Sequence, residues 1–147
     1  MIKRIPFIHH IELNVTEIKR SKAFYNPILT WLGYRRSGSR IWVSDNSMIC
    51  IWRRTVKEMR VIEGAGLHHL AFGVETQKEV DDFYNEVLLK INGVKIKSPP
   101  KYCPEFKYNT YYATYFDDPD SNYLEVVYTD PINSKRYSGH YKTKQIV

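Results

Sequence analysis

Two short stretches of the chain alternate regularly between apolar and more polar side chains. They are residues 9–15 (HHIELNV) and residues 68–74 (HHLAFGV). A period of two predicts a β-strand with one face packed on the core and one face left open. The second histidine of each pair, His10 or His69, falls on the open face. We therefore expect these two side chains to face a cleft.

The two predicted strands belong to a longer repeat. The histidine pairs begin at positions 9 and 68, an offset of 59 residues, and the same offset carries Phe24-Tyr25 onto Phe83-Tyr84. A constant offset across several motifs indicates internal duplication. The predicted parts are a module at 5–56, a polar linker at 57–66, a module at 65–130, one domain that spans 5–130, and a polar, basic tail at 131–147.

A helix is predicted after each of these strands. The second helix has a single apolar stripe, a capping box from Thr76 to Glu79, and Gly93 where a helix end favours a left-handed residue. The first helix is predicted at residues 21–32, where Pro27 should cause a kink or a late start. The stripe of the second helix consists of Val80, Phe83, Tyr84, Val87, Leu88 and Ile91.

Three further strands are predicted in each module. Residues 98–109 contain three prolines and are predicted to be a loop long enough to act as a lid. Residues 117–122 (DDPDSN) have the composition of a turn. The fold class is therefore α+β, with two tandem βαβββ modules that form a cupped mixed sheet with helices outside. The predicted strands are 34–37, 40–43 and 48–53 in the first module, and 94–97, 110–116 and 123–128 in the second.

The open strand faces carry a candidate metal site. His10 and His69 occupy equivalent positions, and Glu125 lies on the last predicted strand, where a buried carboxylate needs a partner. A single strand histidine is more often a hydrogen-bonded core residue, but two imidazoles and one carboxylate form the ligand set of a facial triad. Such ligands admit zinc, iron, nickel, manganese or cobalt. By strand alternation, His9 and His68 should point into the helix interface.

Composition narrows the class of protein. The net charge is +6, but the basic residues are scattered and no recognition-helix or zinc-finger pattern accompanies them, which disfavours a nucleic-acid partner. No apolar run approaches the roughly 20 residues that a membrane span requires, and nothing is typical of a signal peptide. Two cysteines do not make a disulfide framework. We expect a cytoplasmic protein without membrane contact.

Several motifs in this chain resemble the vicinal-oxygen-chelate superfamily, which includes glyoxalases, bleomycin-resistance proteins and extradiol dioxygenases. The resemblance covers about residues 6–130, and it implies that His10, His69 and Glu125 hold one divalent metal ion. The family turn usually has glycine where this chain has Ser121, and the turn should survive because Asn122 tolerates a left-handed backbone. The matching motifs are residues 10–15 (HIELNV), 21–25 (SKAFY), 69–74 (HLAFGV), 83–84 (FY), 118–122 (DPDSN) and 124–126 (LEV).

The resemblance also suggests roles for three other residues. Cys50 aligns with the position of a fourth ligand in glyoxalase I-like members, but a buried cysteine is more often a small hydrophobe. Tyr115 lies ten residues before Glu125, at a spacing where related three-ligand enzymes have a substrate-binding tyrosine, and is otherwise a sheet aromatic. Glu12 shares the face of His10 and is either a general base or a solvated strand residue. It also replaces the hydroxyl residue of fosfomycin-modifying enzymes.

Two functions remain open from the sequence. The first is an enzyme of the lyase, isomerase or extradiol-dioxygenase type, in which the metal acts on a small substrate through two adjacent oxygens. Isomerisation, oxygen insertion and epoxide opening all fit that description. The second is a bleomycin-resistance-like protein that binds a drug in an aromatic cleft without catalysis. Relatives usually dimerise, so we also expect a homodimer, with a site that lies within one chain or is shared between subunits.

Overall fold

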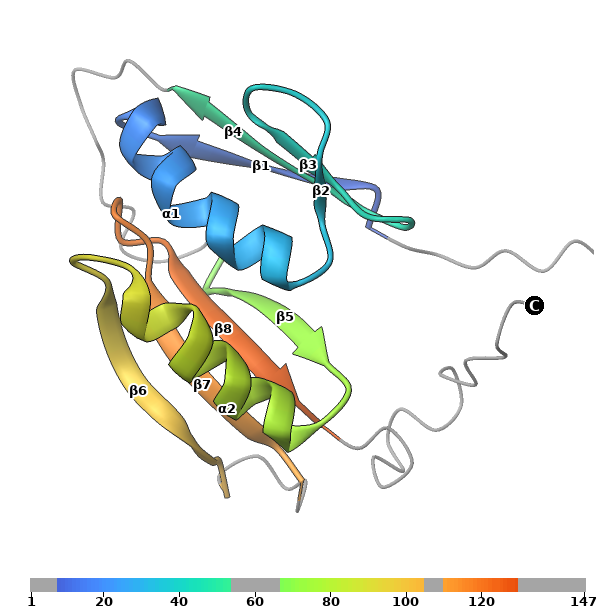
Figure 1. Ribbon diagram of the computed structural model, residues 1–147, viewed down its shortest axis with the longest axis vertical. Coiled ribbons are helices and arrows are strands. Elements are labelled where there is room, and N and C mark those ends of the chain that lie inside the picture. The colour runs from blue at the N-terminus through green and yellow to red at the C-terminus, as the bar shows by residue number, and fades with distance from the viewer. Residues whose placement is uncertain (1–7, 54–66, 105–109, 130–147) are drawn as a thin grey trace, which may run out of the picture. The chain divides into compact units, whose positions relative to one another are not determined.

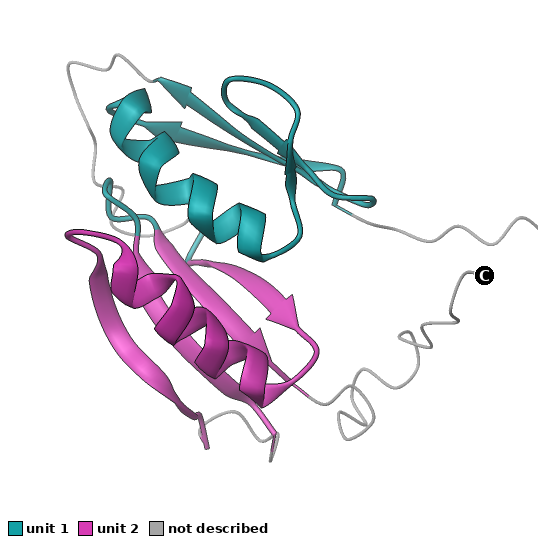
Figure 2. Cartoon of the chain, in the orientation of Figure 1, with its two compact units in different colours: residues 1–68, 118–122 teal, residues 69–117, 123–147 magenta. Residues whose placement is uncertain are grey.

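The computed structural model of the chain describes residues 8–53, 67–104 and 110–129. It divides into two compact units (Figure 2). Unit 1 comprises residues 1–68 and 118–122, and unit 2 comprises residues 69–117 and 123–147. The order β-α-β-β-β occurs once in each unit, so the two tandem modules predicted from the repeat are confirmed.

Unit 1 contains a four-stranded mixed sheet with one helix against it (Figure 1). The strand order is β1-β4-β3-β2, and the outer strand β1 runs parallel to β4 while the other pairs are antiparallel. Leu13 and Val15 are buried and Glu12 and Asn14 are exposed, as the alternation predicted. The elements are β1 (His10–Val15), α1 (Ile18–Trp31), β2 (Arg35–Arg36), β3 (Ile41–Val43) and β4 (Met48–Arg53).

Helix α1 begins earlier than predicted, at Ile18 rather than at residue 21. The cause is Glu17, whose carboxylate accepts hydrogen bonds from the backbone N–H groups of Lys19 and Arg20 at 2.8 and 2.6 Å. These N–H groups have no partner within the helix, so the side chain stabilises the first turn. Pro27 lies inside the helix and does not delay its start.

Unit 2 repeats the arrangement with longer strands. Its sheet has the order β5-β8-β7-β6, with β5 parallel to β8, and α2 lies across β7 and β8 (Figure 1). The predicted capping box is present, because Thr76 accepts from the backbone of Glu79 and Glu79 accepts from that of Thr76. Gly93 is left-handed, with φ 74°. The elements are β5 (Leu70–Val74), α2 (Gln77–Glu86), the 3₁₀ helix η1 (Leu88–Lys90), β6 (Lys95–Tyr102), β7 (Tyr112–Asp117) and β8 (Tyr123–Tyr128).

Strand β6 corrects the prediction of a loop at residues 98–109. The strand continues through Pro99 and Pro100 to Tyr102. Proline has no N–H to donate to a sheet, but β6 is an edge strand, and its pairing with β7 shifts register between Ile96 and Lys101. The predicted lid also includes residues 105–109, which lie outside the described part of the chain.

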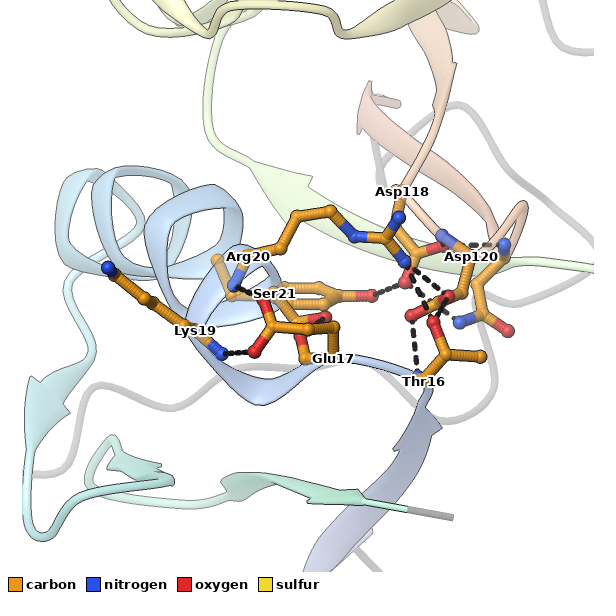
Figure 3. A network of polar contacts seen from close by, with 9 residues as sticks. Thr16, Glu17, Lys19, Arg20, Ser21, Asp118 and Asp120 are labelled. Atoms are coloured by element: carbon orange, nitrogen blue, oxygen red, sulfur yellow. Dashed lines mark hydrogen bonds and ion pairs between the residues drawn. The ribbon is translucent and has the colours of Figure 1, made fainter. Parts of the chain in front are cut away.

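The turn between β7 and β8 belongs to unit 1, where it contacts the start of α1 (Figure 3). Asp118 is 1 % exposed and accepts hydrogen bonds from the backbone of Asp120 and from the Tyr25 hydroxyl, the latter at 2.7 Å. Asp120 accepts from the Thr16 hydroxyl and backbone N–H and from the Arg20 guanidinium. We call residues 118–122 the Asp118 turn; its carboxylates accept hydrogen bonds from the side chains of Thr16, Arg20 and Tyr25.

The left-handed position of the Asp118 turn is Ser121, with φ 67°. We had expected Asn122 to supply the tolerance for a left-handed backbone, and this assignment is wrong. Asn122 instead donates its backbone N–H and its side-chain amide to Asp118, at 2.7 and 2.8 Å. These bonds offset the cost of a left-handed residue that has a Cβ.

The predicted fold class is confirmed as α+β, with tandem βαβββ modules and a helix on the outside of each mixed sheet. Within the described ranges, no helix is both long enough and apolar enough to cross a membrane.

Candidate functional site

One face of the unit 2 sheet packs on α2, and the opposite face carries Glu125. Leu124 and Val126 of β8 are fully buried on the helix side, and Phe116 of β7 packs there against Phe83 of α2 with ring centroids 5.7 Å apart. Successive side chains of a strand point to opposite faces. Glu125 therefore lies on the face away from the helix.

Sheet pairing determines which residues share that face with Glu125. In the ladder, Glu125 pairs with Ala71 of β5 on one side and with Tyr115 of β7 on the other. Paired residues have their side chains on the same face, close enough for direct contact. The predicted substrate residue Tyr115 is thus the cross-strand neighbour of the predicted ligand Glu125.

The carboxylate of Glu125 is completely buried. Its Oε1 accepts a hydrogen bond of 2.7 Å from the Tyr111 hydroxyl. Its Oε2 lies 2.8 Å from Nε2 of His69, a distance short enough for an ion pair if the imidazole is protonated. That contact does not meet the geometry of a hydrogen bond, and Oε2 accepts none from any described residue. A buried carboxylate oxygen that accepts no hydrogen bond lowers the stability of the fold unless a cation binds it.

The distance between these two atoms suits a shared metal ion. Two ligand atoms about 2.1 Å from one ion and at right angles to each other are separated by about 3.0 Å. The 2.8 Å between His69 Nε2 and Glu125 Oε2 is close to this value. Nitrogen and carboxylate oxygen are also the donor types of a facial-triad centre. The residues present therefore fit a divalent metal ion.

Aromatic rings and a thiol surround this pair. Tyr123 stacks on Tyr115 with ring centroids 5.7 Å apart and lies edge-to-face with His69 at the same distance. Cys103 is buried, and its Sγ lies 3.7 Å from the Tyr115 hydroxyl. Burial is the main cause that raises the pKa of Tyr111 and of Tyr115, and the Glu125 charge adds to it in both. Both phenols consequently remain protonated, and able to donate, at neutral pH.

The other predicted site residues belong to unit 1. His10 and Glu12 are exposed residues of β1. Among the described residues, no three or more His, Cys, Asp or Glu side chains gather as a metal-binding group. The pair formed by His69 and Glu125 is accordingly the part of the predicted ligand set that the structure brings together.

The predicted orientation of His9 and His68 is wrong. Both residues are exposed, and neither is buried against a helix. The Nδ1 atom of His9 lies 2.8 Å from Nδ1 of His10. Strand alternation does not extend to these positions, because β1 begins only at His10 and β5 only at Leu70.

Cys50 of β4 is the structural counterpart of Glu125 in unit 1. It pairs with Glu12 in the ladder, as Glu125 pairs with Ala71, and Glu12 and Ala71 are separated by the repeat offset of 59. Burial, followed by the charge of Glu12, raises the pKa of the Cys50 thiol. These surroundings favour a protonated thiol that packs as a small hydrophobe.

Tyr111 was not among the residues predicted for the site. It immediately precedes β7, and its backbone accepts a hydrogen bond from Cys103. One sequence signal was available: Tyr111 lies four positions before Tyr115, so an extended backbone puts both on one face.

Comparisons with known proteins support a glyoxalase-type fold. No family model matches the chain. The uncharacterized protein YqjT of Bacillus subtilis is 28% identical over 131 residues, which cover 82% of this chain and 97% of that protein. The crystal structure of a proposed glyoxalase from Bacillus halodurans has a TM-score of 0.62 and 25% identity, and covers 82% of this chain and 94% of its own.

The fosfomycin resistance protein FosX from Listeria monocytogenes has the same fold, with a TM-score of 0.60. It is 20% identical to this chain, and the match covers 90% of this chain and 98% of that protein. The resemblance drawn from the sequence motifs is confirmed by these structures.

Proposed function

We propose that this chain, whose fold is like those of the proposed glyoxalase from Bacillus halodurans and of FosX, is a divalent-metal-dependent enzyme of the vicinal-oxygen-chelate type. Its substrate would be a small molecule that presents two adjacent oxygen atoms. The observation that carries the proposal is the buried Oε2 of Glu125, which faces His69 Nε2 at 2.8 Å and accepts no hydrogen bond from the described residues. Two protein ligands do not fill the coordination sphere of a divalent ion. The remaining positions are available to a further protein ligand and to substrate.

We assign three ligands to the ion: His69, Glu125 and His10. His10 is included because it occupies in the first repeat the position of His69 in the second. It can come from the same chain or from a second subunit. When bound, a zinc, iron, nickel, manganese or cobalt ion would act as a Lewis acid on the substrate oxygens.

The neighbouring side chains would bind and orient the substrate. Tyr115 is a protonated phenol beside Glu125 and would donate a hydrogen bond to a substrate oxygen as negative charge develops there. Stacked Tyr115 and Tyr123 rings would exclude water from one side. Glu12 is exposed on the strand of His10 and is assigned as the general base. Lyase, isomerase and extradiol-dioxygenase reactions are all compatible with these roles.

The second candidate function is a drug-binding protein of the bleomycin-resistance type. The observation that favours it is the aromatic lining made by Tyr111, Tyr115 and Tyr123 around the site. Such a protein would bind an aromatic ligand equally well with and without metal. For either function we propose a homodimer in the cytoplasm, and light scattering that reports a monomer at high protein concentration would refute the assembly.

Metal stoichiometry tests the main proposal. Chelator-treated protein is incubated with Mn²⁺, Fe²⁺, Co²⁺, Ni²⁺ or Zn²⁺, desalted, and analysed for bound metal. The wild type should retain one ion per chain for at least one of these metals. His69→Ala and Glu125→Ala should each lose it, while His68→Ala, which changes the exposed neighbour, should keep it. No retention of any metal by the wild type, or full retention by Glu125→Ala, would refute the proposal.

A further inference from the structure

The Tyr111 hydroxyl donates a hydrogen bond to Oε1 of Glu125, whereas Oε2 accepts none from the described residues, so this bond distinguishes the two carboxylate oxygens. We propose that Tyr111 is a positioning residue that reserves Oε1 and leaves Oε2 alone to bind the metal ion. The inference rests on the proposed metal site. It adds a residue that was not predicted from the sequence and that touches neither substrate nor ion.

The geometry separates the two oxygens of the carboxylate. The Tyr111 hydroxyl lies 2.7 Å from Oε1, whereas His69 Nε2 lies 2.8 Å from Oε2. A donor to a carboxylate makes a strong hydrogen bond when water is excluded, and Glu125 is completely buried. Each oxygen therefore has a different neighbour, and the carboxylate plane is fixed by both.

The position of Tyr111 suits a residue that orients a ligand. It lies where the chain enters β7, and its backbone carbonyl accepts a hydrogen bond of 3.0 Å from the N–H of Cys103, beside β6. Tyr111 also packs against the small buried cluster of Cys103, Ala113 and Val127. Backbone and ring are thus both held, so the hydroxyl can hold the carboxylate in turn.

Removing this hydroxyl should change how Glu125 binds the ion. In Tyr111→Phe, Glu125 loses the donor that fixes its orientation, so its carboxylate can rotate and change how its two oxygens bind the ion. Partners that orient a metal ligand typically contribute about 10–100-fold to metal affinity. We therefore expect Tyr111→Phe to bind Co²⁺ about 10–100-fold more weakly than the wild type.

Tyr112→Phe provides the matched control. Tyr112 is the next residue, it is also a tyrosine, and its hydroxyl also donates to a carboxylate, that of Asp81 on α2 at 2.9 Å. It lies on the opposite face of the sheet from Glu125. Tyr112→Phe removes the same atom from the neighbouring residue without touching Glu125, so it should keep the wild-type affinity for Co²⁺.

The experiment combines calorimetric titration with Co²⁺ and the visible spectrum of the Co²⁺ protein. The intensity of the Co²⁺ bands depends on the number and geometry of the ligands. A variant that is only less stable would keep the wild-type bands when it is folded and loaded with Co²⁺. The expected result is weaker binding and altered bands for Tyr111→Phe only. Tyr111→Gln, whose amide can still donate, should recover part of the affinity, and it replaces Tyr111→Phe if that variant does not fold.

The outcomes distinguish this inference from the function on which it rests. If the wild type binds no Co²⁺ and none of the other four metals, the proposed function fails. If the wild type binds Co²⁺ and Tyr111→Phe has the same affinity and spectrum, only the role of Tyr111 is overturned. Equal weakening by Tyr111→Phe and Tyr112→Phe with unchanged bands would likewise overturn it, because the effect would then be one of stability.

Discussion

Cys50 and Glu125 occupy the same ladder position in the two units and have opposite chemistry. Each lies on the last strand of its module, buried, and paired with the residue two places after the second histidine of the repeat. Around Glu125 the structure provides a phenol donor and an imidazole. Cys50 is instead buried beside Glu12, whose charge disfavours a thiolate.

The comparison teaches that the repeat preserves the strands and their pairing, while the buried carboxylate occurs at only one of these two equivalent positions. A buried carboxylate is stable only where donors surround it, and these donors come from residues that the first module does not repeat. Tyr115 lies on the strand beside Glu125, and Tyr111 lies just before that strand. In unit 1 the corresponding neighbour of Cys50 is Ile41, which is apolar.

The largest loss of folding free energy is expected when Cys50 is replaced by glutamate, the residue at the equivalent ladder position of unit 2. Cys50→Glu places a buried carboxylate between the apolar Ile41 on one neighbouring strand and the like-charged Glu12 on the other. An uncompensated buried charge costs about 3–5 kcal/mol of folding free energy. Urea unfolding of Cys50→Glu should show a loss of this size, and Cys50→Ala should show much less. Equal stability of Cys50→Glu and wild type would mean that unit 1 can also hold a carboxylate.

The second prediction compares tyrosines that donate to buried carboxylates in the two units. Tyr25 donates to Asp118 in unit 1, and burial, followed by the charge of Asp118, raises the pKa of its hydroxyl. A hydrogen bond to a charged group contributes about 1.5–3 kcal/mol. Tyr25→Phe should therefore lower the free energy of unfolding by about 1.5–3 kcal/mol and leave Co²⁺ affinity unchanged. Weaker Co²⁺ binding in this variant would contradict the purely structural role of the hydrogen bond between Tyr25 and Asp118.

The third prediction concerns the helix that carries a reciprocal cap. Thr76 and Glu79 satisfy each other's backbone N–H groups at the start of α2. Loss of such a cap costs about 1 kcal/mol. Thermal unfolding of Thr76→Ala should show a loss of this size. Thr16→Ala is no suitable control because Thr16 also binds Asp120; Thr30→Ala, exposed near the end of α1, should have a smaller effect.

The smallest effect is expected at the one-sided cap of α1. Backbone hydrogen bonds from Lys19 and Arg20 lower the pKa of Glu17 below its ordinary value of 4.5. Because the folded pKa is lowered, the stabilisation is complete above the unfolded pKa and is lost as the pH falls through the folded one. Glu17→Gln should thus narrow the stability difference between pH 7 and acidic pH slightly. Identical pH profiles for wild type and Glu17→Gln would contradict this role.

Local patterns in the sequence predicted the fold well because they depend on near neighbours. The alternation of Leu13 and Val15 with polar residues and the capping box at Thr76 were both read correctly. The strand through Pro99 and Pro100 was missed because it is permitted only by an edge position, which depends on sheet order. A lone sequence does not reveal which strand will be at the edge.

The candidate site was only partly predictable for a related reason. The motifs named His69 and Glu125 together, and the structure brings His69 Nε2 to 2.8 Å from Glu125 Oε2 although His69 lies just before β5. His9 and His68 were misassigned because alternation was extended beyond the start of each strand. Tyr111 was missed because its reach to Glu125 depends on where the backbone enters β7.

The Asp118 turn has a consequence for how the protein is made. A ribosome produces the chain from one end at about 5–20 residues per second, so early segments emerge seconds before late ones. Tyr25 binds Asp118, which lies 93 positions later in the chain, and Thr16 binds Asp120, which lies 104 positions later. Neither hydrogen bond can form until the later residue has been synthesised. Unit 1 therefore cannot be completed on the nascent chain before most of unit 2 has been synthesised.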